Sequence, residues 1–399
     1  MPALKMPGPA ILAGAAGVAA LIAAGFAAGA NTERVLVNQA FRHDPDRNEG
    51  YGRLHGESRQ VIAEDGVPLH VEVNEPRGFR PGVDLTIVFS HGFALNQDAW
   101  HYQRRDLGSL GRLVFWDQRS HGRSERAPDG THTVEQLGRD LAAVVQQVAP
   151  RGPVILVGHS MGGMTVMSLA AQYPQWFGSK IVGVALISTS AGKMDRIALG
   201  LPQPAADVLH HHSTGAAQLM RQQKSLIEFG RSRTSDLNFL LTKAYSFGAW
   251  SSPSMTRFVS DMIAATPVDV VAEFLPNLRT HDKSAALDAL QNVDVLVMVG
   301  DHDLVTPEEH SQEIIRRVDQ GKLVVLPDSG HMVITERHPE VNFHLRELVY
   351  EVVGAEAVIE RPAVRRRDPK ARTGGRGARA VRPRRPRRAG PPRREGAGN

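Results

Sequence analysis

The sequence predicts an α/β fold in which helices cover both faces of a mostly parallel eight-stranded sheet. Eight short apolar runs, rich in β-branched residues, have the length of strands, and most of them alternate with helical stretches. These runs span residues 58–63, 69–73, 85–89, 113–116, 154–157, 181–187, 293–299 and 322–326. In addition, a G-x-S-x-G motif lies between one run and a helical stretch, and a long region without strand runs separates the sixth run from the seventh.

The remaining elements follow from local patterns. The first two runs are predicted to form a hairpin, because Glu64-Asp65-Gly66 between them is a typical turn sequence. Helices are expected over 97–107, 134–148, 161–172, 307–318 and 339–353. The region 191–290 is expected to be a helical cap over the carboxyl edge of the sheet, with helices over 216–229, 236–245, 254–264 and 268–275. The core of the fold would then consist of two parts, residues 58–190 and 291–355.

The strongest functional signal lies where the fifth run meets the following helix. Gly158, Ser160 and Gly162 form the G-x-S-x-G motif between a strand and a helix, which is the context that gives this motif its meaning. A turn this tight strains the serine backbone and leaves room only for glycine two residues to either side. The helix N-terminus behind the serine offers free N–H groups and a positive dipole end. We therefore expect Ser160 to be a nucleophile; the alternative is a glycine-rich helix entry with an idle serine.

A serine hydroxyl is a weak nucleophile and needs a histidine base that a carboxylate orients. The chain has 17 histidines, so position must select the base. His331 follows the last strand run and Asp303 follows the preceding one, which places both loops at the edge where the serine loop ends. The chain order serine, acid, histidine is the order expected for such a sheet. Asp301, two residues earlier, is the alternative acid.

Residues 58–355 resemble the α/β-hydrolase family. The resemblance depends on Gly158-His159-Ser160-Met161-Gly162-Gly163 as a nucleophile elbow, His91-Gly92-Phe93 as an oxyanion loop, Gly300-Asp301-His302-Asp303 with Thr306-Pro307 as an acid loop, and Gly330-His331 as a base loop. Residues 117–124 are also similar to the family's D-x-R-G-H-G-x-S turn, with Ser120 in place of a usual glycine. The family spacing from Gly300 selects Asp303 over Asp301. His91 and His121 are expected to be structural turn residues.

The resemblance implies a serine hydrolase of the carboxylesterase or lipase-like type. Ser160 would attack an acyl carbonyl, His331 would transfer the proton, Asp303 would orient the imidazole, and the N–H groups of Phe93 and Met161 would form the oxyanion hole. We expect a small-molecule ester with an apolar acyl group as substrate, and no cofactor or metal. Thioesters, lactones and small amides are further possible substrates. The alternatives are an acyltransferase or a cofactor-independent haloperoxidase or perhydrolase on the same fold, and a non-catalytic binding protein.

The amino-terminal region predicts a membrane segment. Residues 10–30 contain no charged side chain and are long enough to span a bilayer as a helix, and Lys5 lies in the short segment 1–9 before them. We expect an uncleaved transmembrane anchor; the alternatives are a secretory signal cleaved after Ala28-Gly29-Ala30 and a soluble Ala-rich helix. The protein would accordingly be membrane-associated or secreted. The polar residues 31–57 are expected to form a linker.

Positive charge is concentrated at the carboxyl terminus. The formal net charge is +5, yet residues 361–399 hold fourteen Arg and one Lys against two acidic residues, so the rest of the chain is acidic. The Arg-, Pro- and Gly-rich region 356–399 is predicted to be a disordered tail, and no nucleic-acid partner is expected for the folded body. The chain has no cysteine, which excludes disulfides and a cysteine nucleophile. His210-His211-His212 is expected to be a surface cluster and not a metal site.

Overall fold

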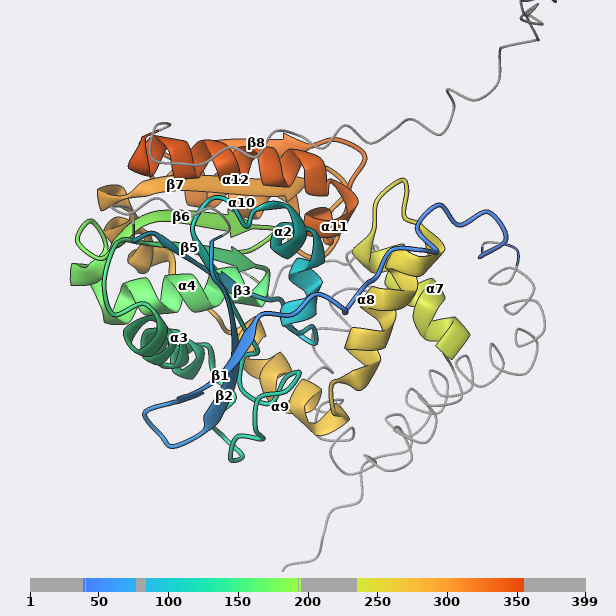
Figure 1. The fold of residues 1–399 in the computed structure, drawn as a ribbon, viewed down its shortest axis with the longest axis horizontal. Helices are drawn as coiled ribbons and strands as arrows, with labels where there is room; N and C mark the ends of the chain where they lie inside the picture. The colour runs from blue at the N-terminus through green and yellow to red at the C-terminus, as the bar shows by residue number, and fades with distance from the viewer. Residues whose placement is uncertain (1–38, 40, 77–83, 193, 195–234, 355–399) are drawn as a thin grey trace, which may run out of the picture. The chain divides into compact units, whose positions relative to one another are not determined.

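The computed structural model describes residues 39, 41–76, 84–192, 194 and 235–354. Eight strands within these residues form one sheet in the order β1-β2-β4-β3-β5-β6-β7-β8 (Figure 1). The strands are β1 Glu57–Ile62, β2 Pro68–Asn74, β3 Thr86–Ser90, β4 Arg112–Trp116, β5 Val154–His159, β6 Ile181–Ile187, β7 Asp294–Gly300 and β8 Lys322–Leu326. The predicted eight-stranded sheet is therefore confirmed, and each strand begins and ends within two residues of its expected limits.

The sheet is parallel apart from its first two strands. β1 pairs with β2 as an antiparallel hairpin, and β2 pairs with β4 in the antiparallel sense. The pairs β3/β4, β3/β5, β5/β6, β6/β7 and β7/β8 are all parallel. Because parallel strands share one carboxyl edge, the loops that follow β3, β4, β5, β6, β7 and β8 leave the sheet on the same side. Every sequence-predicted site residue lies on or next to one of these loops.

The predicted core helices are also present. They are α2 His101–Asp106, α3 Val134–Val148, α4 Met161–Gln172, α10 Glu308–Ile315 and α12 His338–Val353. The helices α3 and α4 match their predicted ranges residue for residue, and Thr133 caps α3 by accepting a hydrogen bond from the N–H of Gln136. A single 3-10 turn, Gln97–Trp100, precedes α2. The short helix α11, Val333–Glu336, was not predicted, because four residues are too few to show a helical period.

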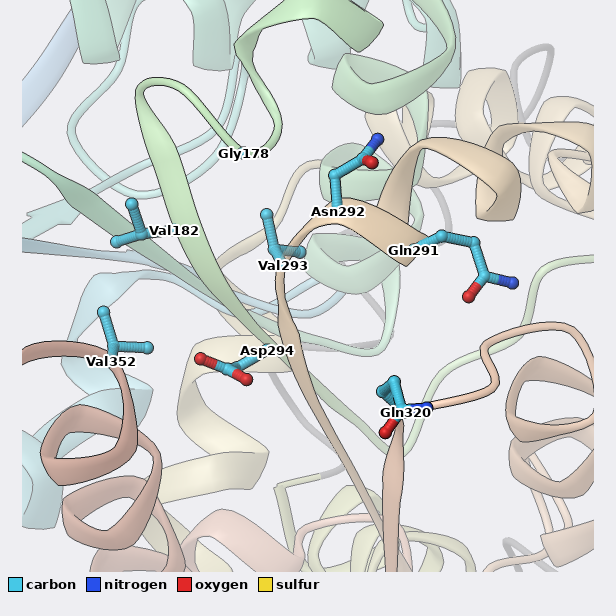
Figure 2. A pocket seen from close by; sticks show the side chains of 8 residues that line it. All are labelled: Gly178, Val182, Gln291, Asn292, Val293, Asp294, Gln320 and Val352. Carbon is cyan, nitrogen blue, oxygen red and sulfur yellow. The ribbon is translucent and has the colours of Figure 1, made fainter.

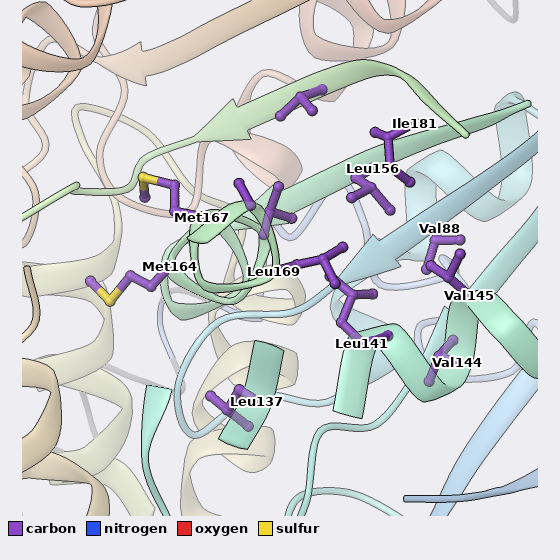
Figure 3. Close-up of a cluster of buried hydrophobic side chains, with 14 of the residues drawn as sticks. Val88, Leu137, Leu141, Val144, Val145, Leu156, Met164, Met167, Leu169 and Ile181 are labelled. Atoms are coloured by element: carbon purple, nitrogen blue, oxygen red, sulfur yellow. The ribbon is translucent and has the colours of Figure 1, made fainter. Parts of the chain in front are cut away.

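Both faces of the sheet are buried, as a parallel sheet requires. Along β5, Val154 and Leu156 belong to one apolar cluster, whereas Ile155 and Val157 belong to the other. The first cluster lies between the sheet and helices α3 and α4, and Figure 3 shows Leu141, Val145 and Leu169 packed toward the strands. The second cluster contains residues of α2 and α12. This arrangement explains why the strand runs are continuously apolar in the sequence instead of alternating.

Among the residues that the structure describes between β6 and β7, three α-helices lie in the region predicted to form a helical cap. They are α7 Ser235–Ser246, α8 Pro253–Ala265 and α9 Val268–Arg279. The helix α9 continues through Pro276, beyond its predicted end at 275, although proline has no N–H to donate. The side-chain amide of Asn277 donates from Nδ2 to the carbonyl oxygen of Glu273 at 3.0 Å, which keeps a hydrogen bond across that turn. The predicted helix 216–229 and the His210–His212 cluster lie outside the described residues.

Residues 41–56, which fall within the predicted linker 31–57, pack against both α8 and the core. Asp44 accepts a hydrogen bond from the N–H of Ser254 at 2.9 Å. The ring of Tyr51 stacks on Phe258 with centroids 4.8 Å apart, and its hydroxyl lies 2.7 Å from that of Tyr102 in α2. This segment therefore ties the region between β6 and β7 to the sheet-covering helices.

The predicted membrane segment and tail lie outside the residues that the structure describes. Among residues 39, 41–76, 84–192, 194 and 235–354, no helix combines the length and apolar character that crossing a bilayer demands. The segment 10–30 and the tail 356–399 fall outside those ranges, so the anchor and the disordered tail stay predictions.

Candidate active site

Ser160 lies in a strained turn between β5 and α4. Its backbone has φ 52° and ψ −120°, a left-handed conformation that costs a side-chain-bearing residue of order 1–3 kcal/mol. The neighbouring glycines are required by close contacts. A Cβ at Gly158 would lie 2.4 Å from the carbonyl oxygen of Gly162, and a Cβ at Gly162 would lie 2.0 Å from that of Ser90. The turn therefore has the tight geometry that the sequence motif predicts.

The structure brings three predicted site residues together at the carboxyl edge of the sheet. The Oγ of Ser160 lies 2.9 Å from Nε2 of His331. Nδ1 of His331 lies 2.9 Å from Oδ2 and 3.1 Å from Oδ1 of Asp303. Ser160 and His331 are each 8% exposed and Asp303 is 4% exposed. The result is a continuous hydrogen-bonded relay from a hydroxyl through an imidazole to a buried carboxylate.

The surroundings of Asp303 keep it ionised and fix its orientation. Burial alone would raise the pKa of this carboxyl, but the nearby His331 and hydrogen bonds from His331 and Thr306 hold it below its ordinary value. Oδ1 accepts from the N–H groups of Val305 and Thr306 at 2.9 and 2.8 Å, and Oδ2 accepts from the Thr306 hydroxyl at 3.0 Å. An ionised carboxylate can only accept, so His331 donates from Nδ1 and leaves Nε2 free to accept from Ser160.

Phe93 and Met161 lie where the resemblance places an oxyanion hole. Gly92, which precedes Phe93, is so close to the turn at Ser160 that a Cβ there would lie 3.2 Å from Cβ of Ser160. Met161 is the first residue of α4, and N–H groups in the first turn of a helix have no intrahelical acceptor. The assignment of these two N–H groups to an oxyanion hole stays a prediction of the resemblance.

Two buried histidines hold the oxyanion loop in place. Nε2 of His91 accepts from the N–H of Gln118 at 2.9 Å, and Nε2 of His121 accepts from the N–H of Ala94 at 3.2 Å. Complete burial lowers the pKa of His91 to about 4 and that of His121 to about 3, so both rings are neutral near pH 7. The Gln118 amide donates to the carbonyl oxygen of His91 at 2.6 Å. The structural role expected for His91 and His121 agrees with these contacts.

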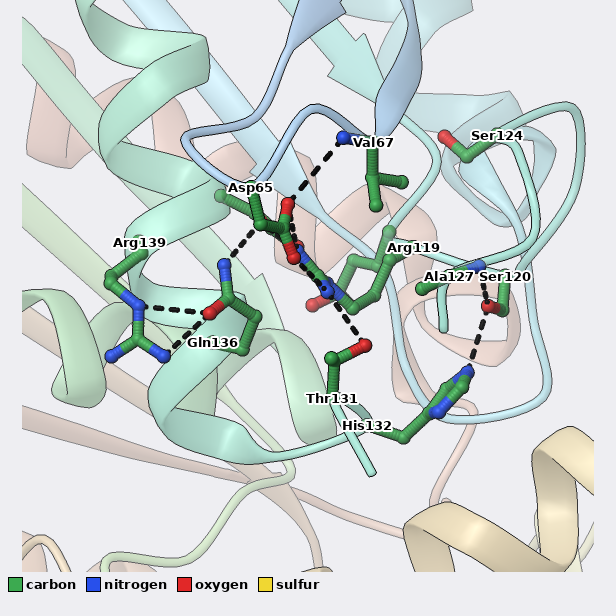
Figure 4. Close-up of polar contacts among 12 residues, drawn as sticks. Asp65, Val67, Arg119, Ser120, Ser124, Ala127, Thr131, His132, Gln136 and Arg139 are labelled. Carbon is green, nitrogen blue, oxygen red and sulfur yellow. Dashed lines mark hydrogen bonds and ion pairs between the residues drawn. The ribbon is translucent and has the colours of Figure 1, made fainter. Parts of the chain in front are cut away.

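The loop after β4 is itself anchored by a polar cluster, part of which Figure 4 shows. Arg119 is fully buried and forms ion pairs with Asp140 at 2.6 Å and Asp65 at 2.9 Å. Ser120, which replaces a usual family glycine, has φ 63°. Its Oγ lies 2.9 Å from Nε2 of His132 and accepts from the N–H of Ala127 at 2.9 Å. These hydrogen bonds offset the strain that a serine incurs in a left-handed conformation.

Sequence reasoning missed two further residues next to the relay. His159 donates from Nε2 to the carbonyl oxygen of His331 at 2.9 Å, and burial lowers its pKa to about 3, so it supports the base as a neutral donor. Its position inside the G-x-S-x-G motif was the available signal. Glu336 accepts from the N–H of Gly330, next to the base, at 2.7 Å. Nothing in the sequence marked it, because the contact depends on the short helix α11.

The alternative acid, Asp301, is not part of the relay. Asp301 is exposed, and its Oδ1 lies 2.6 Å from Nδ1 of His302, which is exposed as well. A hollow of about 340 Å³ (Figure 2) is lined by residues at the amino ends of β6 and β7, the edge opposite Ser160, and is not part of this site. Within the part of the chain that the structure describes, no group of three or more His, Asp or Glu side chains is arranged to hold a metal ion.

Comparison with known proteins identifies the family to which this chain belongs. A model of the alpha/beta hydrolase family matches residues 87–342. An sn-1-specific diacylglycerol lipase of Mus musculus is 26% identical over 260 residues, which cover 63% of this chain and 76% of that protein. A non-heme chloroperoxidase of Streptomyces lividans is 32% identical over 148 residues, which cover 37% of this chain and 51% of that protein.

Solved structures agree on the fold. A thermophilic esterase from Thermogutta terrifontis superposes with a TM-score of 0.57 at 24% identity, over 74% of this chain and 98% of that one. An esterase from Exiguobacterium antarcticum gives the same TM-score of 0.57 at 20% identity, over 73% of this chain and 98% of that one. The family match spans more than half of the sequence, and the chain therefore belongs to the alpha/beta hydrolase family.

Proposed function

We propose that the protein is a serine hydrolase that cleaves carboxylic esters through an acyl-enzyme on Ser160. The observation that carries the proposal is the relay in which Ser160 Oγ lies 2.9 Å from His331 Nε2, and His331 Nδ1 lies 2.9 Å from Asp303. A hydroxyl beside an imidazole that a carboxylate orients is the arrangement that acyl transfer requires. No cofactor or metal enters the proposed reaction.

The reaction has two halves. In the first, Ser160 Oγ attacks the ester carbonyl carbon while its proton passes to His331 Nε2, and the N–H groups of Phe93 and Met161 stabilise the oxyanion. Collapse of this intermediate breaks the carbon–oxygen bond, and His331 protonates the leaving alcohol. In the second half, His331 takes a proton from water, the hydroxide attacks the acyl carbon, and the acid leaves as Ser160 regains its proton. Each oxyanion donor is worth roughly 3–4 kcal/mol in the transition state.

Hydrolysis of short-chain p-nitrophenyl esters tests the proposal directly. Replacing Ser160 by Ala removes the nucleophile, and kcat should fall by at least about 10⁴-fold, with only background hydrolysis left. Ser179→Ala is the matched control, because Ser179 is exposed and its hydroxyl bonds only to backbone carbonyls of its own turn. Well-folded protein that turns over no ester at any acyl length would contradict the proposal.

An apolar acyl group fits the surroundings of the oxyanion loop. The half-buried Phe93 ring packs edge to face on the buried Phe274 of α9, with centroids 6.0 Å apart, so the apolar surface beside the proposed oxyanion hole is that of Phe93. We therefore expect kcat/KM to rise from acetate to butyrate esters. A preference for charged or strongly polar acyl groups would contradict this part of the proposal.

The relatives also motivate a second candidate, an acyltransferase or a cofactor-independent haloperoxidase or perhydrolase. One relative is a non-heme chloroperoxidase, and the same relay would serve if an alcohol or peroxide replaced water as the acyl acceptor. Adding hydrogen peroxide or an alcohol to the ester assay separates these reactions. If the acyl group goes preferentially to the added acceptor when water is in excess, transfer is the main activity.

We also propose that residues 10–30 attach the protein to a membrane as an uncleaved anchor. Support comes from the uncharged, Ala- and Gly-rich composition of this segment. The intact mass of the mature protein distinguishes an uncleaved anchor from a cleaved secretory signal. Retention of residues 1–30 together with recovery in the membrane fraction supports an anchor, whereas loss of these residues supports a cleaved signal and a secreted enzyme.

A further inference from the structure

The chain that leaves α7 runs along the loop that carries His331. We call residues 246–249 the exit segment and residues 328–332 the base loop. The N–H of Met332 donates to the carbonyl oxygen of Ser246 at 2.7 Å, and the N–H of Ala249 donates to that of Asp328 at 3.2 Å. These two hydrogen bonds flank His331 on the base loop. The region between β6 and β7 is therefore attached directly to the segment that holds the base.

The two segments touch backbone to backbone. A Cβ at Gly330 would lie 2.6 Å from the carbonyl carbon of Phe247, and a Cβ at Gly248 would lie 2.7 Å from Cα of Ser329. Glycine on each side thus permits a contact that any side chain would prevent. Phe247 next to the contact is 5% exposed and packs in the same apolar cluster as Met332. A movement of the exit segment would for these reasons displace the base loop.

The carboxylate of Glu336 accepts hydrogen bonds from both the exit segment and the base loop. Oε1 of Glu336 accepts from the N–H of Gly330, and Oε2 accepts from the N–H of Gly248, both at 2.7 Å. Gly330 immediately precedes His331, so one of the two hydrogen bonds holds the Ser329–Gly330 peptide unit, one residue before the base. Hydrogen bonds between a charged carboxylate and backbone N–H groups are about twice as strong as neutral ones. The ionised carboxylate offers a strong acceptor oxygen to each of the two amides, whereas a protonated carboxyl keeps only one.

We propose that Glu336 is a positioning residue that clamps the exit segment onto the base loop and so keeps the His331 imidazole in reach of Ser160. The inference rests on the proposed function, because it assigns Glu336 a role in the same reaction. Glu336 touches neither the substrate nor Ser160 in this role, and acts through the backbone of Gly330 and His331. Its ionisation state then sets how firmly the base is held.

The groups around Glu336 place its ionisation near neutral pH. Burial raises the pKa of this carboxyl to about 7, and the negative charge of Asp303 acts in the same direction, whereas the two amide hydrogen bonds and Arg337 oppose them. His302 on the loop after β7 and Asp328 and His331 on the base loop are further titratable groups near this contact, and the exit segment carries none. Protonation turns one acceptor oxygen into a hydroxyl and weakens one of the two amide bonds. The clamp should therefore be largely formed above about pH 8 and loosened below about pH 6.

Glu336→Gln is the appropriate variant, since a carboxamide has the shape of the protonated carboxyl and likewise only one acceptor oxygen. We expect kcat of the variant for p-nitrophenyl butyrate to be roughly 10-fold below wild type at about pH 8.5, with KM unchanged. The ratio should shrink to within about twofold at about pH 5.5, where the wild-type group is itself protonated. Glu351→Gln, an exposed glutamate of α12, is the control and should match wild type at both pH values. A ratio that does not change with pH would overturn the proposal.

Hydrogen–deuterium exchange of the wild-type protein provides a second test that needs neither the variant nor an activity. After correction for the intrinsic pH dependence, exchange in peptides covering 246–250 and 328–332 should quicken by several-fold as the pH falls through about 7. Peptides of β5 should show no such change. Uniform protection across this range would overturn the inference. If the clamp loosens as expected but no ester is turned over, the proposed function fails and the structural coupling stands.

Discussion

Replacement of Asp303 by Asn gives the most specific test of the relay, because the structure dictates how the new amide must lie. Oδ1 accepts from the N–H groups of Val305 and Thr306 at 2.9 and 2.8 Å, so the oxygen of Asn must take this position. Its NH₂ group then takes the place of Oδ2, which lies 2.9 Å from Nδ1 of His331. An NH₂ group can only donate, so Nδ1 must accept and the ring proton moves to Nε2, facing Ser160.

The consequence is a correctly placed base in the wrong tautomer. His331 can no longer accept the Ser160 proton, although distances and packing are almost unchanged. We expect kcat/KM at about pH 7.5 to fall by roughly 10⁴-fold, which corresponds to about 5.5 kcal/mol of lost transition-state stabilisation. The assay is initial-rate hydrolysis of p-nitrophenyl butyrate, with circular dichroism and thermal unfolding to show that the variant remains folded.

Asp301→Asn is the matched control, since Asp301 is the other acid that the sequence allowed. Asp301 is exposed and lies beside His302, not the relay, and we expect a loss of less than about 10-fold. If Asp303→Asn retains activity within about 10-fold of wild type, or if Asp301→Asn loses as much, the assignment of the acid is wrong.

Three further predictions concern the scaffold of the site. Burial would raise the pKa of Glu72, but hydrogen bonding to Gly56 and the charges of Arg104 and Arg123 lower it from 4.5 to about 2. Its carboxylate therefore adds stability above pH 4.5 that is lost as the pH falls toward 2. In urea unfolding, the free energy of unfolding of Glu72→Gln should fall by about 1–2 kcal/mol less than that of wild type over this pH range. The same pH dependence in both proteins would contradict the prediction. Ser120→Gly loses two hydrogen bonds but relieves the backbone strain at φ 63°, so the free energy of unfolding should fall by only about 1 kcal/mol. A fall above about 3 kcal/mol would show that the strain at Ser120 is negligible. Phe274→Ala, which removes a fully buried ring of α9, should cost about 3–5 kcal/mol in urea unfolding, and a loss below about 1 kcal/mol would mean that α9 is not packed as described.

The sequence was most informative where a pattern repeats or a motif fixes geometry. Strand runs such as 154–157 are apolar at every position, because β5 is buried on both faces, and this made the parallel sheet predictable. Ser160, Asp303 and His331 could be selected because parallel strands bring their following loops to one edge, whatever their separation in the chain. Position relative to the strands, rather than residue type alone, identified one histidine among seventeen.

Contacts between distant segments were beyond prediction. The clamp formed by Glu336 depends on the register of the exit segment against the base loop, and no local pattern encodes that register. The packing of Tyr51 against Phe258 was missed for a related reason, since the polar composition of residues 31–57 indicated a linker. The helix α9 extends past Pro276 because packing and a side-chain hydrogen bond offset the missing N–H, whereas local propensity alone ends the helix there.

Labelling with a fluorophosphonate, followed by mass spectrometry of the peptides, tests the central claim most directly. The reagent reacts with serines that a neighbouring base activates, so it reports the relay without any assumption about the natural substrate. We predict a single adduct on Ser160, which is lost in Ser160→Ala and strongly slowed in Asp303→Asn. Folded protein that forms no adduct, or that carries it on a different serine, would contradict the account.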